Sequence, residues 1–272
     1  MVGKIKKFFR KFETLAEYEQ YVSDVDNFIL PNVSLCKENE TLYYNKYATS
    51  IDYSKEYFTI EALEDGLNVK LSQNASYYRI DNDDWISLSA NTTTPSINKG
   101  QTIQFKITNP TISYSGIGTF TINKKCNVSG NVMSLLYGDN FEGQINLSGK
   151  YYAFSYLFQY CTTLQSAENL ILPAITLASS CYQYMFYGCK SLTTAPQLPA
   201  TTLVDYCYSY MFNGCSKLNY IKMLATDINA HYCLNNWVNK VASSGTFVKS
   251  ASMESLPSGT SGIPNGWTVE NA

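Results

Sequence analysis

One stretch decides the fold, Cys181-Tyr-Gln-Tyr-Met-Phe-Tyr-Gly-Cys189, because the chain repeats it. The pattern returns as Cys207-Tyr-Ser-Tyr-Met-Phe-Asn-Gly-Cys215, twenty-six positions later (207 − 181). The segment between the copies keeps the same offset, since Leu172-Pro-Ala174 returns as Leu198-Pro-Ala200. A unit of this length cannot bury its apolar side alone, so we expect the copies to stack around one continuous core.

Further copies extend the repeat in both directions. A first copy lies upstream at 154–161, and a degraded one follows at 224–233. A period between 20 and 29 residues, with leucines and a short strand in each unit, is typical of leucine-rich repeats. We therefore predict a leucine-rich-repeat solenoid over 136–272, and we expect its Gly/Ser/Pro-rich end, with Trp267, to form a C-terminal cap.

The preceding segment, 55–135, favours short antiparallel strands. Apolar and polar residues alternate in several runs that are separated by turn signals such as Asp65-Gly66 and Lys99-Gly100. This spacing predicts a β-sandwich-like module of immunoglobulin-like shape. The expected strands are 57–60, 67–71, 77–80, 85–88 and 102–107. Two further strands, 119–122 and 132–136, are expected to continue this sheet or to begin the next module.

Residues 1–54 differ from the rest and are expected to anchor the protein. Thr14-Leu-Ala-Glu17 is a capping box that predicts a helix to about residue 26, and 33–44 predicts a small hairpin. The arm before the helix interleaves cations with phenylalanines. We expect it to be disordered and to become ordered on docking to a partner protein, the alternative being a solvated tail without a role. The candidate anchoring residues are Lys4, Lys6, Lys7, Phe8, Phe9, Arg10, Lys11 and Phe12.

Composition excludes several classes of function. The 272 residues carry a net charge of −2, so no overall positive field would recruit nucleic acid. No run of apolar residues reaches the length of a membrane span, and the N-terminal segment lacks the apolar stretch of a signal peptide. Only 15 % of residues are charged, and abundant Thr, Tyr, Asn and Ser favour a mainly β protein.

Eight cysteines indicate packing rather than cross-linking. Six of them recur at equivalent repeat positions, where side chains of stacked units point into the same core layer. We interpret them as buried free thiols that act as small hydrophobic residues. The chain contains no Cys-x-x-Cys pair, so a zinc site is not predicted.

No residue pattern predicts catalysis, a metal or a cofactor. His231 is the only histidine, and the nearby Cys233 occupies a repeat position that packing explains. The acidic loop 81–84 could bind calcium, but it lacks the spacing of a calcium-binding loop, so a solvated hairpin turn is the preferred interpretation.

Tyrosine is in excess, and the repeats place it in rows. Alternate residues of a strand face opposite sides, so one row could pack inside while its neighbour faces outward. Exposed tyrosines could stack on sugar rings or dock a protein, whereas the alternative is that they fill the core and its edge. The candidate ligand-surface residues are Tyr182, Tyr184, Tyr187, Tyr208 and Tyr210.

The repeat unit resembles the BspA-like leucine-rich repeats of surface proteins from gut Bacteroidales and of the phages that infect them. The residues that carry the resemblance are the 181–189 and 207–215 motifs and the Leu-Pro-Ala-Thr-Thr-Leu run that begins at Leu198. It covers about 55–272, whereas 1–50 resembles, more loosely, attachment segments of virion proteins from crAss-like phages.

That resemblance implies a phage virion accessory structural protein, such as a head fibre or a tail-associated adhesin, and implies a homotrimer. Its N-terminus would bind a capsid or tail protein, and its repeats would bind a host-surface glycan or protein. The alternative is a leucine-rich-repeat adhesin of the bacterial cell surface.

Overall fold

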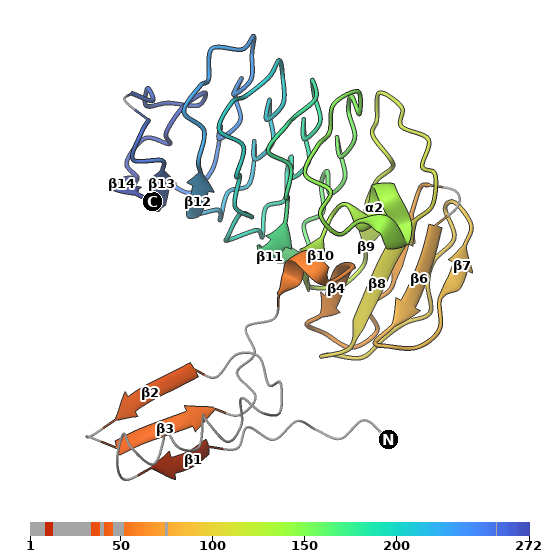
Figure 1. Ribbon diagram of the computed structural model, residues 1–272. Coiled ribbons are helices and arrows are strands. Elements are labelled where there is room, and N and C mark those ends of the chain that lie inside the picture. Colours follow the sequence, from red (N-terminus) through yellow and green to blue (C-terminus); the bar gives the residue numbers. More distant parts are fainter. Residues whose placement is uncertain (1–8, 13–33, 39–40, 46–51, 74–75, 254) are drawn as a thin grey trace. The chain divides into compact units, whose positions relative to one another are not determined.

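The computed structural model describes residues 9–12, 34–38, 41–45, 52–73, 76–253 and 255–272 (Figure 1). The protein is mainly β, with several sheets and little helix. It divides into two compact units, Met1–Asp52 and Tyr53–Ala272. The second unit contains the repeats.

The first unit holds a three-stranded antiparallel sheet. Its order is β1 (Phe9–Phe12), β3 (Thr41–Asn45), β2 (Ser34–Glu38). The predicted hairpin is confirmed, because β2 and β3 pair across 39–40. The prediction of a disordered arm is wrong for 9–12, since the backbone of this segment pairs with β3. The expected helix at 14–26 and the candidate anchoring residues Lys4, Lys6, Lys7 and Phe8 lie outside the described residues.

The second unit begins with a six-stranded sheet in the order β11-β10-β4-β8-β6-β7. All its pairings are antiparallel except β10 with β11, which is parallel. Two further strands, β5 and β9, pair separately. The bounds are β4 Phe58–Ala62, β5 Val69–Leu71, β6 Ser76–Ile80, β7 Ile86–Leu88, β8 Thr102–Ile107, β9 Phe120–Ile122, β10 Cys126–Asn131 and β11 Leu164–Ile171.

Six expected strands are therefore present, but 132–136 is not one of them. This segment contains a short helix, α2 (Ser134–Tyr137), followed by the 3-10 turn η2 (Gly138–Asn140); another 3-10 turn, η1 (Tyr53–Lys55), precedes β4. The buried Ser134 holds this helix against strands β4 and β8. Its hydroxyl accepts a hydrogen bond from the Phe58 N–H and donates one to the Phe105 carbonyl, both at 3.0 Å.

The repeats form a stack of coils, in which the backbone of each coil hydrogen-bonds to the next (Figure 1). The equivalent segments 150–161, 178–189, 204–215 and 230–241, here called the turn segments, lie in register. The Phe154 N–H donates to the Cys181 carbonyl at 2.7 Å, and the Phe186 N–H donates to the Met211 carbonyl at 3.0 Å. The expected stacking of the Met185 and Met211 segments is thus confirmed.

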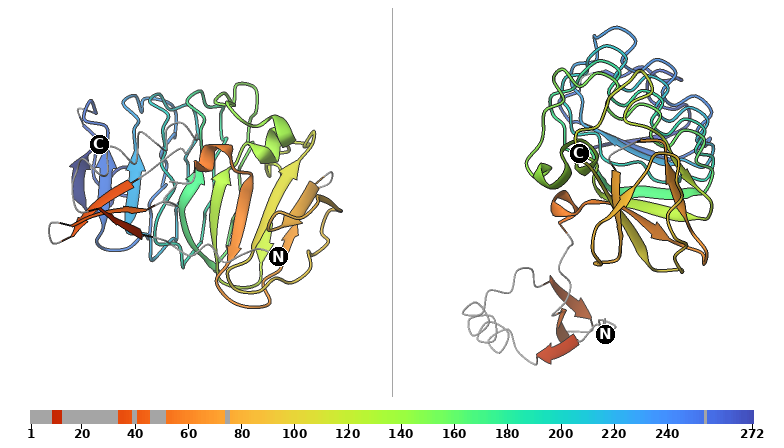
Figure 2. Two further views of the ribbon diagram at one scale, coloured as in Figure 1. Left: turned by 60° about the horizontal axis from the view of Figure 1, so that its bottom comes forward. Right: turned by 90° about the vertical axis from the view of Figure 1, so that its right-hand side faces the viewer.

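The turn segments are not the strands that the repeat suggested. They are runs of tight turns in which every fourth residue has a positive φ, for example Ser180, Tyr184 and Gly188. Strands occur elsewhere in the later coils, where β12 (Tyr220–Met223), β13 (Thr246–Lys249) and β14 (Thr268–Asn271) form a parallel sheet. Figure 2 shows these strands continuing the series of coils away from the six-stranded sheet.

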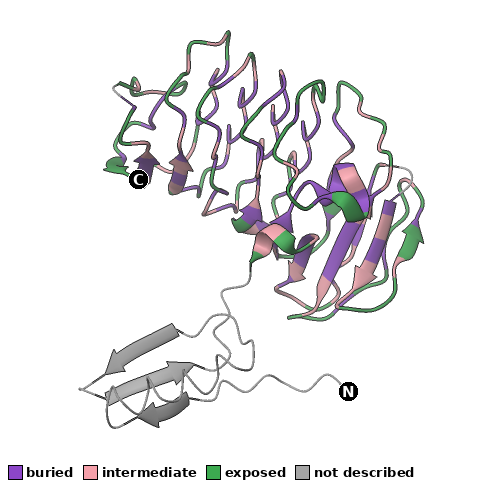
Figure 3. Cartoon of the chain, viewed as in Figure 1, coloured by how far each residue is buried: buried purple, intermediate pink, exposed green. Residues whose placement is uncertain are grey.

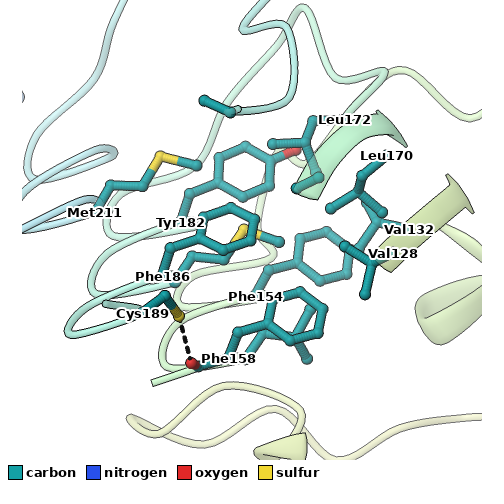
Figure 4. Close-up of a cluster of buried hydrophobic side chains, with 14 of the residues drawn as sticks. Val128, Val132, Phe154, Phe158, Leu170, Leu172, Tyr182, Phe186, Cys189 and Met211 are labelled. Carbon is teal, nitrogen blue, oxygen red and sulfur yellow. Dashed lines mark hydrogen bonds between the residues drawn. The ribbon is translucent and has the colours of Figure 1, made fainter. Parts of the chain in front are cut away.

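One buried cluster runs from Phe58 to Trp267, through both the six-stranded sheet and the coils (Figure 3). Within it, equivalent side chains stack from coil to coil. The Phe186 ring lies 5.3 Å from Phe158 (Figure 4) and 5.5 Å from Phe212, nearly parallel to both. The core is continuous across residue 135. The boundary between two modules that the sequence predicts at this position stays a prediction.

Candidate functional site

The outward tyrosines of the turn segments form the most regular surface feature of the second unit. Tyr156, Tyr184 and Tyr210 occupy equivalent positions in three successive coils, and each has a positive φ near 60°. Their rings stack almost parallel, with centroids 4.9 and 4.8 Å apart. All three side chains are half-buried. The coil spacing therefore converts a sequence repeat into an aromatic row.

Two more tyrosines widen this row. Tyr187 meets Tyr184 edge to face at 5.4 Å, and it meets Tyr160 in the same way at 5.3 Å. Tyr160 is 62 % exposed. We call the five residues the tyrosine face. They are Tyr156, Tyr160, Tyr184, Tyr187 and Tyr210.

The structure places the five candidate ligand-surface tyrosines in two different environments. Tyr184, Tyr187 and Tyr210 belong to the tyrosine face, but Tyr182 and Tyr208 are only 1 % exposed and fill the core. In the four-residue period of the turn segments, Tyr182 lies at an inward position and Tyr184 at an outward one. The sequence prediction did not include Tyr156 and Tyr160, although their spacing of four residues is also that of Tyr206 and Tyr210 in a later turn segment.

Burial raises the pKa of two members of the row, Tyr156 and Tyr184. Desolvation is the main cause for both, with repulsion from neighbouring tyrosines added. These two residues therefore present neutral hydroxyl groups at physiological pH. They can donate and accept hydrogen bonds, but they carry no charge with which to attract an ion.

The Tyr182 hydroxyl is buried without a hydrogen-bond partner. An unpaired buried polar group costs about 1–3 kcal/mol. We therefore expect Tyr182→Phe to leave stability unchanged or to raise it by about 1 kcal/mol, measured as the free energy of unfolding in urea. Phe154 already occupies the equivalent position one coil earlier, where its ring stacks on Tyr182 at 5.6 Å.

The reverse substitution is the matched control. Phe154 is fully buried, so Phe154→Tyr should place a new hydroxyl in the same apolar layer and lower stability. A clear loss of stability on Tyr182→Phe would show instead that the hydroxyl has a partner in the folded protein.

The six repeat cysteines are buried free thiols, as predicted, and so is Cys126. Two of them also satisfy backbone groups of the preceding coil. The Cys189 Sγ donates to the Phe158 carbonyl and the Cys215 Sγ to the Phe186 carbonyl, both at 3.0 Å (Figure 4). Beside them, a hydrogen bond from Cys126 lowers the pKa of the Cys161 thiol, a feature with no signal in the sequence.

The structure places Cys233 and His231 in different surroundings. Burial raises the pKa of Cys233, whose Sγ donates to the Ile228 carbonyl at 3.2 Å. The His231 ring is exposed and contacts the rings of Tyr206 and Tyr232.

The acidic loop at 81–84 is the hairpin turn that was preferred for it, since it joins the antiparallel strands β6 and β7. The Asp81 carboxylate accepts hydrogen bonds from the Thr102 N–H at 2.9 Å and from the Gln101 amide at 3.1 Å. In the described part of the chain, no three His, Cys, Asp or Glu side chains gather in a way that could hold a metal.

A second cluster, on the six-stranded sheet, combines cations with aromatic rings. The Lys106 ammonium lies 4.5 Å from the Trp85 ring and forms an ion pair with Asp139 at 2.7 Å. The Arg79 guanidinium lies 4.8 Å from the same ring. The Tyr57 hydroxyl donates to Asp139 at 2.6 Å. The charged ends of Lys106, Asp139 and Arg79 all have polar partners, which indicates a structural role.

This cluster predicts a pH dependence of stability. The hydrogen bonds from Lys106 and then Tyr57 lower the pKa of Asp139 below its unfolded value of about 4, so its contribution is present above that pH and is lost as the pH falls through the folded pKa. Because Asp139 is 59 % exposed, the contribution should not exceed about 1 kcal/mol. Asp139→Asn should lower the free energy of unfolding at pH 7 but not at pH 2.

The opposite sign applies to Tyr57. Burial, followed by the hydrogen bond to Asp139, raises its pKa to about 12. Its contribution is complete below the unfolded pKa of about 10 and is lost as the pH rises through 12. Tyr57→Phe should therefore reduce the fall in stability between pH 10 and 12, measured by urea unfolding at a series of pH values. If the free energy of unfolding of Tyr57→Phe fell between pH 10 and 12 as steeply as that of the wild type, the raised pKa would not belong to Tyr57.

No helix in the described ranges is long and apolar enough to cross a membrane. Comparisons of the chain with protein families, with characterised proteins and with solved structures find no match. The resemblance to BspA-like repeats therefore depends on the repeat sequence alone.

Proposed function

We propose that the chain is a non-catalytic phage virion accessory protein that binds a host surface through its tyrosine face. In this proposal the stacked coils are a BspA-like leucine-rich-repeat solenoid, and the β module before them is an immunoglobulin-like spacer. The N-terminal unit anchors the chain to a capsid or tail protein, and the virion carries it as a trimer. No cofactor or nucleic acid takes part.

The tyrosine face is the observation that carries the proposal. Tyrosine offers a large amphipathic contact area, and ordering its two side-chain torsions costs little entropy. Here the tyrosine side chains are already ordered before a partner binds, because the rings of successive coils stack on one another. A rigid row of identical groups suits a partner that also repeats, such as a linear glycan or a regular protein array on a cell surface.

The stacking also restricts how the partner binds. The faces of the Tyr184 ring are covered by Tyr156 and Tyr210, so a sugar cannot stack on it. What remains accessible is the ring edge with its hydroxyl group. We therefore expect a partner that lies along the row and exchanges hydrogen bonds with it, while its apolar parts contact the ring edges.

A triple substitution tests this face without harming the fold. Asn236 occupies the equivalent position in the next coil with a positive φ, and asparagine tolerates this conformation better than most residues. The full chain with Tyr156→Asn, Tyr184→Asn and Tyr210→Asn should lose binding to host cells at least tenfold. Tyr232→Asn is the matched control, because Tyr232 is an exposed tyrosine at positive φ outside the face. Equal binding by both variants would exclude the tyrosine face.

The location on a virion has its own test. Mass spectrometry of purified particles from the phage that encodes the chain should detect it, together with a capsid or tail protein that cross-links to residues 1–52. Detection on bacterial cell envelopes, and not on particles, would favour the alternative of a bacterial surface adhesin.

A further inference from the structure

A pocket at the first turn segment is independent of the tyrosine face. It measures about 470 Å³ and is formed where the loop 112–114 meets the loop 149–152. Three of its six lining residues are tyrosines. The lining residues are Ile112, Ser113, Tyr114, Gly149, Tyr151 and Tyr152.

The walls of this pocket are fixed to each other. Ser113 and Gly116 exchange backbone hydrogen bonds at 3.1 and 3.0 Å, which closes a tight turn with Tyr114 at its tip. The Ile117 N–H then donates to the Ala153 carbonyl at 3.1 Å. The contact is so close that a Cβ atom on Gly116 would lie 2.5 Å from the Ser155 carbonyl oxygen. A ligand therefore meets a preformed site.

Unlike the tyrosine face, this pocket offers accessible ring faces. Tyr114 is 82 % exposed, more than any other large hydrophobic residue in the described part of the chain, and Tyr151 is 59 % exposed. Tyr114 meets Tyr152 edge to face, with 73° between the ring planes. This contact therefore cannot cover the faces of both rings. Rings in this arrangement can stack on a flat ligand.

The charge of the lining narrows the class of ligand. None of the six lining residues is charged, so the pocket has no group for a phosphate, a sulfate or a carboxylate. The one cation in these loops, Lys150, lines the neighbouring pocket and approaches the ring of Tyr137. Aromatic faces beside neutral hydroxyl groups suit a neutral ligand that has both an apolar face and hydroxyl groups.

We infer that this pocket binds a neutral sugar ring of a host-surface glycan, which stacks on Tyr114 or Tyr151. The C–H face of a pyranose is apolar and would cover an exposed ring, while its hydroxyl groups would bond to the tyrosine hydroxyls at the rim. The pocket is preformed, so binding orders only the ligand and a few side-chain torsions. This inference stands even where the tyrosine face does not bind, because the two sites share no residue.

The test uses the full chain on an array of neutral and acidic oligosaccharides, followed by calorimetric titration of the strongest neutral ligand. Tyr114→Ser with Tyr151→Ser should lower the affinity at least tenfold. Tyr232→Asn is the matched control, because it removes an exposed tyrosine that does not line the pocket, at a positive φ that asparagine tolerates. It should bind the ligand as the wild type does, and circular dichroism checks that each variant is folded.

The outcomes separate this pocket from the tyrosine face. The triple asparagine variant should bind the neutral ligand with unchanged affinity, because it leaves all six lining residues in place. The inference is overturned if the wild-type chain binds no neutral glycan, if it binds acidic glycans alone, or if the double variant Tyr114→Ser with Tyr151→Ser binds as the wild type does. A peptide or a second copy of the chain that competes for the pocket without any sugar binding would overturn it as well.

Discussion

Replacing Phe186 by alanine is expected to lower the free energy of unfolding by about 3–5 kcal/mol. The side chain is fully buried, and its ring is stacked between Phe158 and Phe212. Truncation removes the transfer free energy of the ring and leaves a cavity between two coils. Because each coil contacts only its neighbours, a gap in the middle of the stack weakens two interfaces at once.

Urea unfolding of the full chain, followed by circular dichroism, measures this loss. Tyr160→Asn is the control, because it also removes an aromatic ring, but one that is 62 % exposed, and asparagine tolerates the positive φ there. Its cost should stay below about 1 kcal/mol. Similar losses for the two variants would mean that the rings of the coil stack do not form a close-packed column.

Replacing Gly130 by alanine is expected to cost at least about 3 kcal/mol, again measured in urea. Gly130 lies in β10 at a φ of +76°, a conformation that disfavours any residue with a Cβ. Space is a second obstacle. The new Cβ would lie 2.1 Å from the Tyr57 carbonyl oxygen, and this is backbone that cannot turn aside. The six-stranded sheet would have to open between β10 and the segment before β4.

Gly66→Ala separates these two causes. Gly66 has nearly the same φ, +78°, but a Cβ placed there meets no atom within 4 Å. It should therefore lose only the conformational part, about 1–2 kcal/mol. If the two alanine variants unfolded at the same urea concentration, close approach of the backbone at Gly130 would play no part in stability.

The repeat and most strands could be predicted because their signals are local. The match between 181–189 and 207–215 forces the two copies into equivalent surroundings, and the alternation in 102–107 marks β8. By contrast, β10 and β11 were missed. The sequence of β10, Cys126-Asn-Val-Ser-Gly-Asn131, is polar and contains a glycine, and it becomes a strand because β4 and β11 lie on either side of it.

The candidate site shows the same division. The sequence by itself determined that tyrosines recur in register, that the cysteines share a buried layer and that successive units stack, since each follows from the twenty-six-residue offset. Only the tertiary structure decided which tyrosines face outward. Strand-like alternation and a four-residue turn period both place Tyr182 and Tyr184 on different sides, and the direction depends on which side the neighbouring coils and the sheet occupy. The pocket between Tyr114 and Tyr151 likewise exists only because the fold brings two loops together that are distant in sequence.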